Sequence, residues 1–354
     1  MLTNEIEGRL LLSRHPEQAM PLLERALQQA QAALPSDVTA RNTAAAIQQE
    51  LALREGAQGN WEAALTLVAK QWQRSPSARC TASVSVADQR TLVLVYGNEG
   101  SVQGAYRADR SMADISKEQF IPDALQDLLQ SCPQVSVLAP PLLNPHPDLL
   151  RPSIRWSFVS EQHPDRKPGP VSAGSLLIDT VQRRTVHLIR ADNGGKTPPL
   201  LVSSMLRGLE VTPIRVLAKL RVASRAFLFA QGVCHEGASA LALTPDPAGE
   251  KLTAALVRQQ TLAGRPVIFL SRVPVAQHLG DLEEPWSLPS AFIEAGASLV
   301  ITASQGEDDQ ALLEAVGRIA KALDGGKTAA QAVAEERLRA VAQGIEDFGF
   351  TITE

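Results

Sequence analysis

Residues 288–302 read LPSAFIEAGASLVIT. Residues 289–295 are mostly apolar, as in a buried helix, and Gly296 is the residue type that most often ends one. Residues 298–302 are rich in β-branched side chains, which is typical of a buried strand. The segment therefore predicts one helix-to-strand step of an α/β protein.

The same step recurs along the C-terminal half of the chain. Strands of five or six apolar residues separated by helices predict a largely parallel sheet that helices cover on both faces. Ligands on such sheets bind beyond the carboxyl ends of the strands, which here follow Ala230, Ser271 and Thr302. The other elements predicted in this half are strands at 226–230 and 266–271 and helices at 199–220, 249–262 and 309–323.

Residues 1–78 are predicted to form a small all-helical region, because they are dense in Ala, Leu, Gln and Glu. The segments 16–27 and 61–72 resemble each other at an offset of 61 − 16 = 45 residues, a spacing found in helical repeats. The second segment looks like the second half of a tetratricopeptide repeat, in which Gly59 allows a tight turn and Trp61 fills the gap between helices. A plain helical hairpin that caps the larger domain is the alternative.

Residues 79–354 are assigned to one larger domain. Its first part contains short runs of alternating or β-branched residues, which predict strands and hairpins. The predicted elements are a hairpin of 81–86 with 91–96, a helix at 117–130, strands at 135–139 and 154–159, an exposed loop at 161–170, and a hairpin of 176–179 with 185–190.

Composition and charge exclude several classes of protein. A net charge of −4 argues against a nucleic-acid partner, and no apolar run reaches the roughly 18–20 residues that a membrane span needs. The first residues lack the pattern of a signal peptide. The three cysteines (Cys80, Cys132 and Cys234) are scattered and have no CxxC spacing, so neither a disulfide framework nor a cysteine-based zinc site is expected. These features together favour the cytoplasm as the location of the protein.

Three segments of the C-terminal half carry the pattern of a known family. Residues 288–300 match "LarAFLaaGArsVv", residues 304–309 keep only the acidic pair that ends "lWpVdD", and residues 326–333 match "G.spaeAL". On these segments the chain resembles the CHAT domain family, caspase-like proteases often found behind tetratricopeptide repeats. The resemblance is best over 226–334 and extends to 81–200 only in broad pattern. It implies a caspase-like, mostly parallel sheet covered by helices.

The family's chemistry depends on a cysteine–histidine dyad, in which a thiolate attacks a peptide carbonyl and an imidazole takes and returns the proton. The resemblance places both groups at the ends of adjacent central strands, the Cys within "LsAC" and the His within "HfaaHG". Residues 270–273 read LSRV, so the nucleophile position holds Val273. Aligned without gaps, the second motif puts Gly232 at the histidine position, whereas a shift of three residues puts His235 there.

Other residues are poor replacements for this dyad. Cys234 and His235 are the residual candidates, but adjacent side chains in an extended segment point to opposite faces and do not easily meet one substrate. Ser271 ends a strand without the Gly-x-Ser-x-Gly elbow that exposes a catalytic serine. We expect the Arg272 side chain to fill the cleft in which the family's catalytic groups would lie, or to pair with a carboxylate.

The sequence therefore predicts a non-catalytic pseudo-protease that acts as a protein-binding or regulatory module. Its expected partner is a protein, such as an active CHAT-type protease or another component of a bacterial stress or defence system, a setting that the resemblance alone implies. One alternative is an active CHAT-type cysteine peptidase with a rearranged site that uses His235 and Cys234. Another is an enzyme with unrelated small-molecule chemistry on a similar sheet.

No cofactor and no metal site is expected. The histidines that could have suggested one lie far apart and lack the short spacing of metal-ligand motifs. They are His146, His163 and His187.

Overall fold

The computed structural model divides into two compact units. Unit 1 comprises Met1–Asp114 and Pro122–Ser131, and unit 2 comprises Ile115–Ile121 and Cys132–Glu354. The predicted domains, 1–78 and 79–354, stay a prediction. The structure describes residues 2–11, 15–33, 38–72, 75, 78–87, 89–109, 120–140, 143, 146–160, 175–179, 187–189, 212–235, 238–243, 249–271, 287–304, 309–345 and 348–354.

The N-terminal part of unit 1 is helical, as predicted. Its helices are α1 (Leu2–Leu11), α2 (Pro16–Ala33), α3 (Val38–Ala57) and α4 (Trp61–Gln71). Each of them packs against the next one along the chain, and Leu23 of α2 shares a core with Ile47 of α3. Gly59 turns the chain between α3 and α4 with a positive φ of 77°, a conformation that glycine adopts without steric cost.

Three antiparallel strands complete unit 1. They are β1 (Thr81–Ala87), β2 (Arg90–Tyr96) and β3 (Val102–Arg107), in the order β3-β2-β1. The predicted hairpin is confirmed, because Ala87 pairs with Arg90 at its closed end. Strand β3 was not predicted, and of the predicted helix at 117–130 the described residues contain only α5 (Asp123–Asp127).

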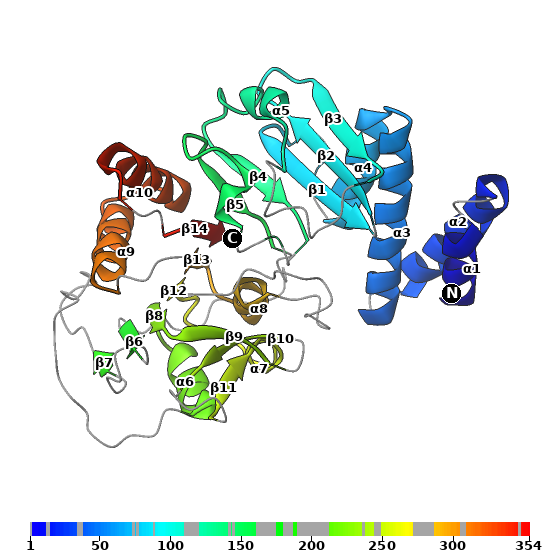
Figure 1. The fold of residues 1–354 in the computed structure, drawn as a ribbon. Helices are drawn as coiled ribbons and strands as arrows, with labels where there is room; N and C mark the ends of the chain where they lie inside the picture. The colour runs from blue at the N-terminus through cyan, green and yellow to red at the C-terminus, as the bar shows by residue number, and fades with distance from the viewer. Residues whose placement is uncertain are drawn as a thin grey trace. The chain divides into compact units, whose positions relative to one another are not determined.

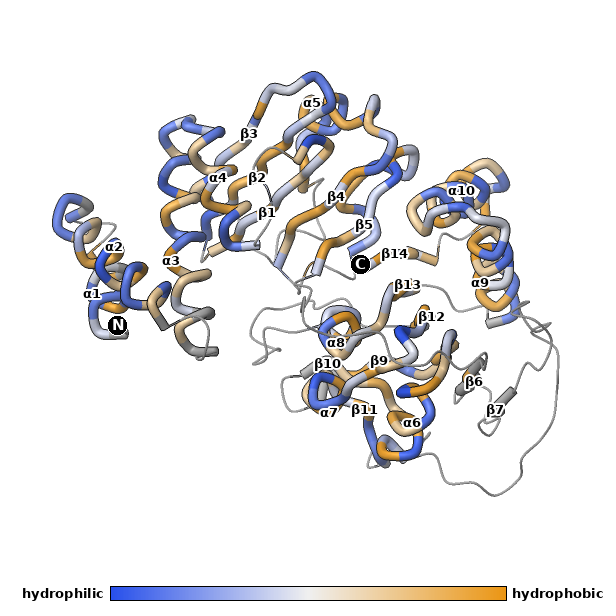
Figure 2. The backbone as a smooth tube through the Cα atoms, turned by 180° about the vertical axis from the view of Figure 1, so that it is seen from behind, coloured by the Kyte–Doolittle hydropathy of each residue, from blue (hydrophilic) through white to orange (hydrophobic). Residues whose placement is uncertain are grey.

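Helices α3 and α4 pack against these strands (Figure 1). A Cβ added at Gly56 of α3 would lie 2.4 Å from Leu92 Cδ1 in β2, and one added at Gly104 of β3 would lie 2.4 Å from Trp61 Cε3. The Trp61 ring thus packs against the backbone of β3, whereas the repeat-like pattern led us to expect it between helices. The tube of β2 is hydrophobic over most of its length and the helices beside it show both colours, as amphipathic helices on a sheet should (Figure 2).

Unit 2 is built on a mostly parallel sheet, as predicted. Its strands lie in the order β4-β5-β14-β13-β12-β8-β6-β7. Only β13 with β14 and β6 with β7 pair antiparallel in this order. The bounds are β4 (Val135–Leu138), β5 (Trp156–Phe158), β6 (Ser175–Asp179), β7 (His187–Ile189), β8 (Arg225–Phe229), β12 (Val267–Leu270), β13 (Leu299–Ala303) and β14 (Phe350–Thr353).

Helices cover both faces of this sheet. They are α6 (Pro213–Leu220), α7 (Ala254–Arg258), α8 (Leu288–Ala295), α9 (Asp309–Asp324) and α10 (Ala329–Gln343). One face, with Ile268 and Leu270 of β12, shares a core with α6, α7 and α8. The other face, with Phe269 stacked on Phe227 at 4.9 Å between ring centroids, shares a core with α9 and α10. The alternation of side chains along β12 thus supplies both cores.

A second, three-stranded antiparallel sheet in unit 2 was not predicted. Its strands are β9 (Gln231–His235), β10 (Ala238–Ala242) and β11 (Lys251–Thr253), in the order β11-β10-β9. It replaces the first part of the helix predicted at 249–262. Leu252 is fully buried in β11, and the Thr253 side chain accepts a hydrogen bond from the Leu256 backbone N–H, so the short helix α7 begins only at Ala254.

One helix end of the C-terminal half follows its predicted signal. Gly296 ends α8 with a φ of 110°, in the left-handed region. Thr328 and Gln331 form a capping box at the start of α10, in which each side chain accepts a hydrogen bond from the other residue's backbone N–H. Arg318 of α9 donates to both carboxylate oxygens of Glu336 in α10, at 2.9 and 2.6 Å, which ties the two helices together.

We expect Thr328→Ala to lower the free energy of unfolding by about 1 kcal/mol, because the Gln331 backbone N–H at the start of α10 loses its acceptor, the Thr328 hydroxyl. Urea denaturation followed by circular dichroism measures the effect. Thr261→Ala is the matched control, because Thr261 is exposed outside any helix. Equal destabilisation by both substitutions would contradict a capping role for Thr328.

Candidate functional site

The carboxyl ends of three central strands meet at one edge of the unit 2 sheet. Leu270 of β12 pairs with Leu228 of β8 on one side and with Thr302 of β13 on the other. The Ser271 backbone N–H donates to the Leu228 carbonyl at 3.1 Å and so continues the ladder by one residue. The structure therefore brings Ala230, Ser271 and Thr302 to the same edge, as the sequence predicted for a ligand site.

Among the described residues, Ser271 has no activating group within hydrogen-bond reach. Its side chain is only 2% exposed, and its Oγ has no hydrogen-bond partner in the described part of the chain. A serine becomes a nucleophile when a base accepts its proton, so this hydroxyl lacks the first requirement for acyl transfer. The residues that the structure describes also contain no group of three His, Cys, Asp or Glu side chains able to hold a metal ion.

Three buried threonine hydroxyls on the neighbouring strands lack partners as well. Thr302, Thr351 and Thr353 are completely buried, and their Oγ1 atoms have no hydrogen-bond partner among the described residues. Thr302 pairs with Thr351, and Thr353 pairs with Val300, a member of the core that α8 shares, so all three lie on the face that α8 covers. These threonines act as β-branched core residues. The strand predicted at 298–302 indicated this role for Thr302, but no prediction covered Thr351 and Thr353.

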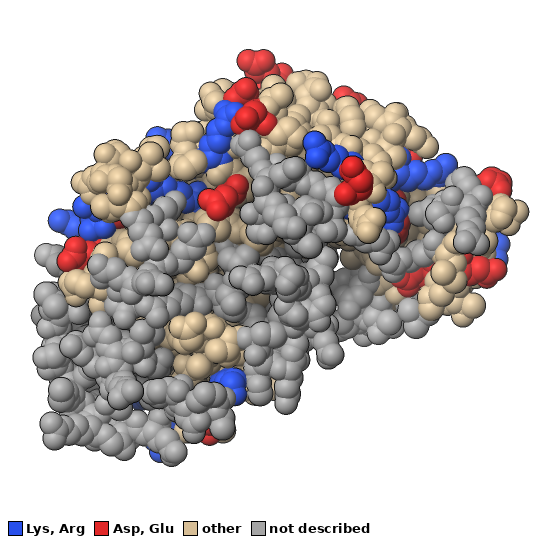
Figure 3. Space-filling model, viewed as in Figure 1, with Lys and Arg blue, Asp and Glu red and all other residues tan. Residues whose placement is uncertain are grey.

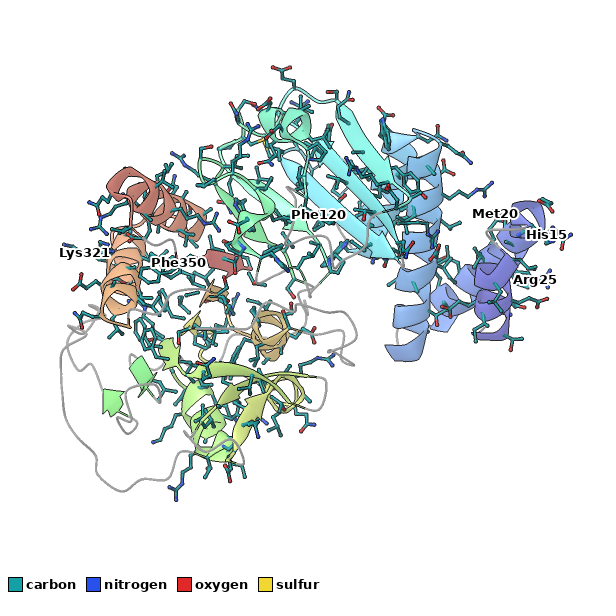
Figure 4. All side chains as sticks on the ribbon, in the orientation of Figure 1. His15, Met20, Arg25, Phe120, Lys321 and Phe350 are labelled. Atoms are coloured by element: carbon teal, nitrogen blue, oxygen red, sulfur yellow. The ribbon has the colours of Figure 1, made fainter. Side chains whose placement is uncertain are left out.

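The end of β13 is closed by the chain's own backbone. The Ser304 hydroxyl donates to the Gly349 carbonyl at 3.1 Å, and the Ser304 backbone N–H donates to the Phe348 carbonyl at 3.2 Å. The chain then continues into β14, where Phe350 (labelled in Figure 4) is buried and receives hydrogen bonds on its carbonyl oxygen from the Arg337 guanidinium. Strand β14 was not predicted, although the alternating residues 350–353 (FTIT) are a strand signal.

The residual catalytic candidates lie in the second sheet of unit 2. Gly232, Cys234 and His235 belong to β9, which begins directly after Ala230. Gly232 is buried and pairs with Leu241 of β10. The backbone of Cys234 and His235 is extended. The argument that these two side chains do not easily meet one substrate assumed this conformation. Val273 and its neighbour Arg272 lie outside the described residues.

The cysteines correct one expectation. Cys80 and Cys132 are disulfide-bonded. Their scattered positions argued against a disulfide, but separation along the chain does not limit which cysteines meet after folding, since a bridge requires only a Cα separation of about 4.4–6.8 Å. Cys234 is the remaining cysteine of the sequence.

Two of the three histidines considered as metal ligands lie among the described residues. His187 pairs with Leu177 between β7 and β6, and His163 lies outside the described residues. His146 is partly buried in unit 2, and burial lowers its pKa to about 4, so it is a neutral imidazole at pH 7. None of the described helices combines the length and the hydropathy needed to cross a membrane.

The comparisons with known proteins add no relative. No family model matches this chain, and no curated protein matches it. The resemblance to the CHAT domain family therefore depends on the quoted segments alone.

We expect Thr302→Val to raise the free energy of unfolding by about 1 kcal/mol, because it replaces a buried hydroxyl that lacks a partner with a methyl group of similar size. Urea denaturation measures the change. Thr302→Ala is the control and should destabilise, since it removes a buried methyl group as well. A lower stability for Thr302→Val would show that this hydroxyl has a partner.

We expect the pH dependence of stability to reveal His146. Because its folded pKa is about 4 and its unfolded pKa about 6.5, the unfolded state binds the extra proton between these values, and stability falls as the pH drops from 6.5 to 4. His146→Gln should remove a loss of about 2–3 kcal/mol over this range. His15→Gln, at an exposed histidine of unit 1, is the control substitution. Identical profiles for wild type and His146→Gln would refute this assignment.

Proposed function

We propose that this chain is a catalytically degenerate, CHAT-type pseudo-protease that acts as a protein-binding or regulatory module. The observation that carries the proposal is Val273 at the position where the family motif has its cysteine. A hydrocarbon side chain forms no thiolate, so the covalent step of a cysteine peptidase has no nucleophile.

The arrangement of two strands supports the assignment to a caspase-like sheet. The family places its histidine and cysteine motifs at the ends of adjacent central strands. Here the segments that align with those motifs follow β8 and β12, which are neighbours and pair in parallel. The resemblance was drawn from the sequence alone, so this agreement in topology is independent support for it.

The edge of the sheet supports the loss of catalysis. Ser271, the hydroxyl nearest in sequence to the vacated position, is buried and has no base as a partner among the described residues. The end of β13 is filled by Ser304 and the segment that leads into Phe350. What the structure describes of this edge is suited to holding the fold together more than to activating a peptide bond.

The partner we propose is a protein, either an active CHAT-type protease or another component of a bacterial stress or defence system. Ile6 and Leu10 of α1 support a contact role for the helical region, because they are one helical turn apart and 57% and 72% exposed. On the face shown in Figure 3, cationic and acidic groups are interspersed over the described surface, unlike the single-sign stripe of a nucleic-acid site.

Two observations favour different cellular compartments for this protein. The odd number of cysteines and their scattered positions in the sequence led us to propose the cytoplasm. The disulfide of Cys80 and Cys132 is the kind of bond that persists in oxidising compartments and is rare in the cytoplasm.

We expect the wild-type protein to cleave no peptide and to form no adduct with electrophilic peptide probes of the kind that label cysteine peptidases. Intact-mass spectrometry measures the adduct. Cys234→Ala is the matched variant, because Cys234 is the thiol that the disulfide does not use. Cleavage by the wild type that disappears in Cys234→Ala would establish the rearranged peptidase instead.

The variant Val273→Cys tests the alignment by placing a thiol at the family's nucleophile position. If only the nucleophile has been lost and His235 stands at the family's histidine position, this variant should react with the probe, and His235→Ala in the same background should slow the reaction by about 10²-fold or more. If Gly232 stands there, both variants should react at the slow rate of an ordinary thiol.

A further inference from the structure

Helix α6 leaves an apolar and cationic face exposed. It buries Val216, Leu217 and Leu220 in the core of unit 2. On its outer side Ile214 is 80% exposed, and Val222, directly after the helix, is 52% exposed. A helix of a monomeric protein usually carries polar residues on this side, so two exposed β-branched apolar residues need an explanation.

Cations surround these two apolar side chains. Lys219, within α6, and Arg221, directly after it, are both exposed. The Gly264 backbone N–H donates to the Arg221 carbonyl at 3.0 Å, which brings the next residue, Arg265, beside the end of α6. We name Ile214, Lys219, Arg221, Val222 and Arg265 the α6 patch.

The local charge of the α6 patch opposes that of the chain. Residues 211–235 contain four Arg or Lys and no Asp or Glu, although the whole chain has a net charge of −4. Just beyond the patch, Arg225 donates to both oxygens of Asp324, at 2.7 and 3.3 Å, so this carboxylate is already engaged. In the described part of the chain, Lys219, Arg221 and Arg265 form no ion pair, which leaves their charges available to a partner.

The backbone at Arg265 adds an independent observation. Its φ is +46°, in the left-handed region that glycine occupies at least cost, and it follows a glycine in the sequence. An arginine at such a position costs stability that a second glycine would not. Residues held in this way are concentrated at functional sites, where the side chain is needed.

We propose that the α6 patch docks an acidic, partly apolar segment of a partner protein. The cations would pair with its carboxylates, and Ile214 and Val222 would contact its apolar side chains. A nucleic-acid backbone would gain nothing from the two apolar residues, and a helix of eight residues is short for insertion into a membrane surface. The inference rests on the proposed function only for the existence of a protein partner.

Fluorescence anisotropy tests the proposal with a labelled synthetic peptide in which Glu and Leu residues alternate and with the same peptide carrying Lys for Glu. We expect only the acidic peptide to bind, and to bind more weakly in 500 mM than in 50 mM salt. The triple variant Lys219→Glu, Arg221→Glu, Arg265→Glu should weaken binding about tenfold or more. The matched control is Arg25→Glu, Lys70→Glu, Lys321→Glu, which changes the net charge equally at exposed positions of the helices α2, α4 and α9 and should bind as the wild type does (Figure 4 labels Arg25 and Lys321).

Arg265→Gly separates binding from folding. It should weaken the acidic peptide several-fold while keeping or raising the free energy of unfolding, because glycine relieves the backbone at φ +46°. Ile214→Ser with Val222→Ser should weaken binding without changing its dependence on salt. A purely structural role for Arg265 would give the opposite pattern, with lower stability and unchanged affinity.

Three outcomes would overturn the proposal: no binding of the acidic peptide, equal losses in the two triple variants, or binding of phosphatidylserine vesicles in place of the peptide. Peptidase activity in the wild type would overturn the pseudo-protease but leave a positive peptide result standing. The two proposals therefore fail separately.

Discussion

Strand β12 is hydrogen-bonded on both sides, to β8 and to β13, and most of unit 2 depends on this parallel ladder. Parallel neighbours cannot be joined by a hairpin, so the chain must return through crossovers that place helices on the faces of the sheet. Because successive side chains of β12 point to opposite faces, Ile268 and Leu270 serve one core and Phe269 the other. A polar residue at any of these three positions would disturb the packing of helices with the sheet.

The same ladder determines where chemistry could occur. Parallel strands bring their carboxyl ends to one edge, and the segments that align with the dyad motifs of the CHAT family follow the two neighbouring strands β8 and β12 there. At this edge the described side chains are those of a protein interior, as the unpartnered hydroxyls of Ser271 and Thr302 illustrate. In the pseudo-protease that we propose, the scaffold would keep its strand order and still present a surface to a partner although its reactive groups are replaced.

Helix α6 shows how packing leaves room for such a surface. Its contribution to the core comes from three apolar residues on one side, so the outer side is free of structural demands. The residues found there, together with Arg265, combine positive charge with exposed apolar area in a chain whose overall charge is negative. This combination suits recognition of a protein segment with the opposite charge.

Local patterns were enough to predict the elements whose own residues carry the signal. The strands β8, β12 and β13 are continuous apolar runs because both of their faces are buried, and Gly296 ends α8 because a left-handed residue stops a helix wherever it occurs. Other features depend on partners that lie far away in the sequence. The short strands β9, β10 and β11 exist through pairing with one another, β14 pairs with β13, and Cys80 and Cys132 acquired their disulfide only in the folded chain. Likewise, the sequence does not show that the hydroxyls of Thr302, Thr351 and Thr353 lack hydrogen-bond partners among the described residues. Whether a buried hydroxyl has a partner depends on the residues that pack against it, and contacts between distant residues are formed only by the tertiary fold.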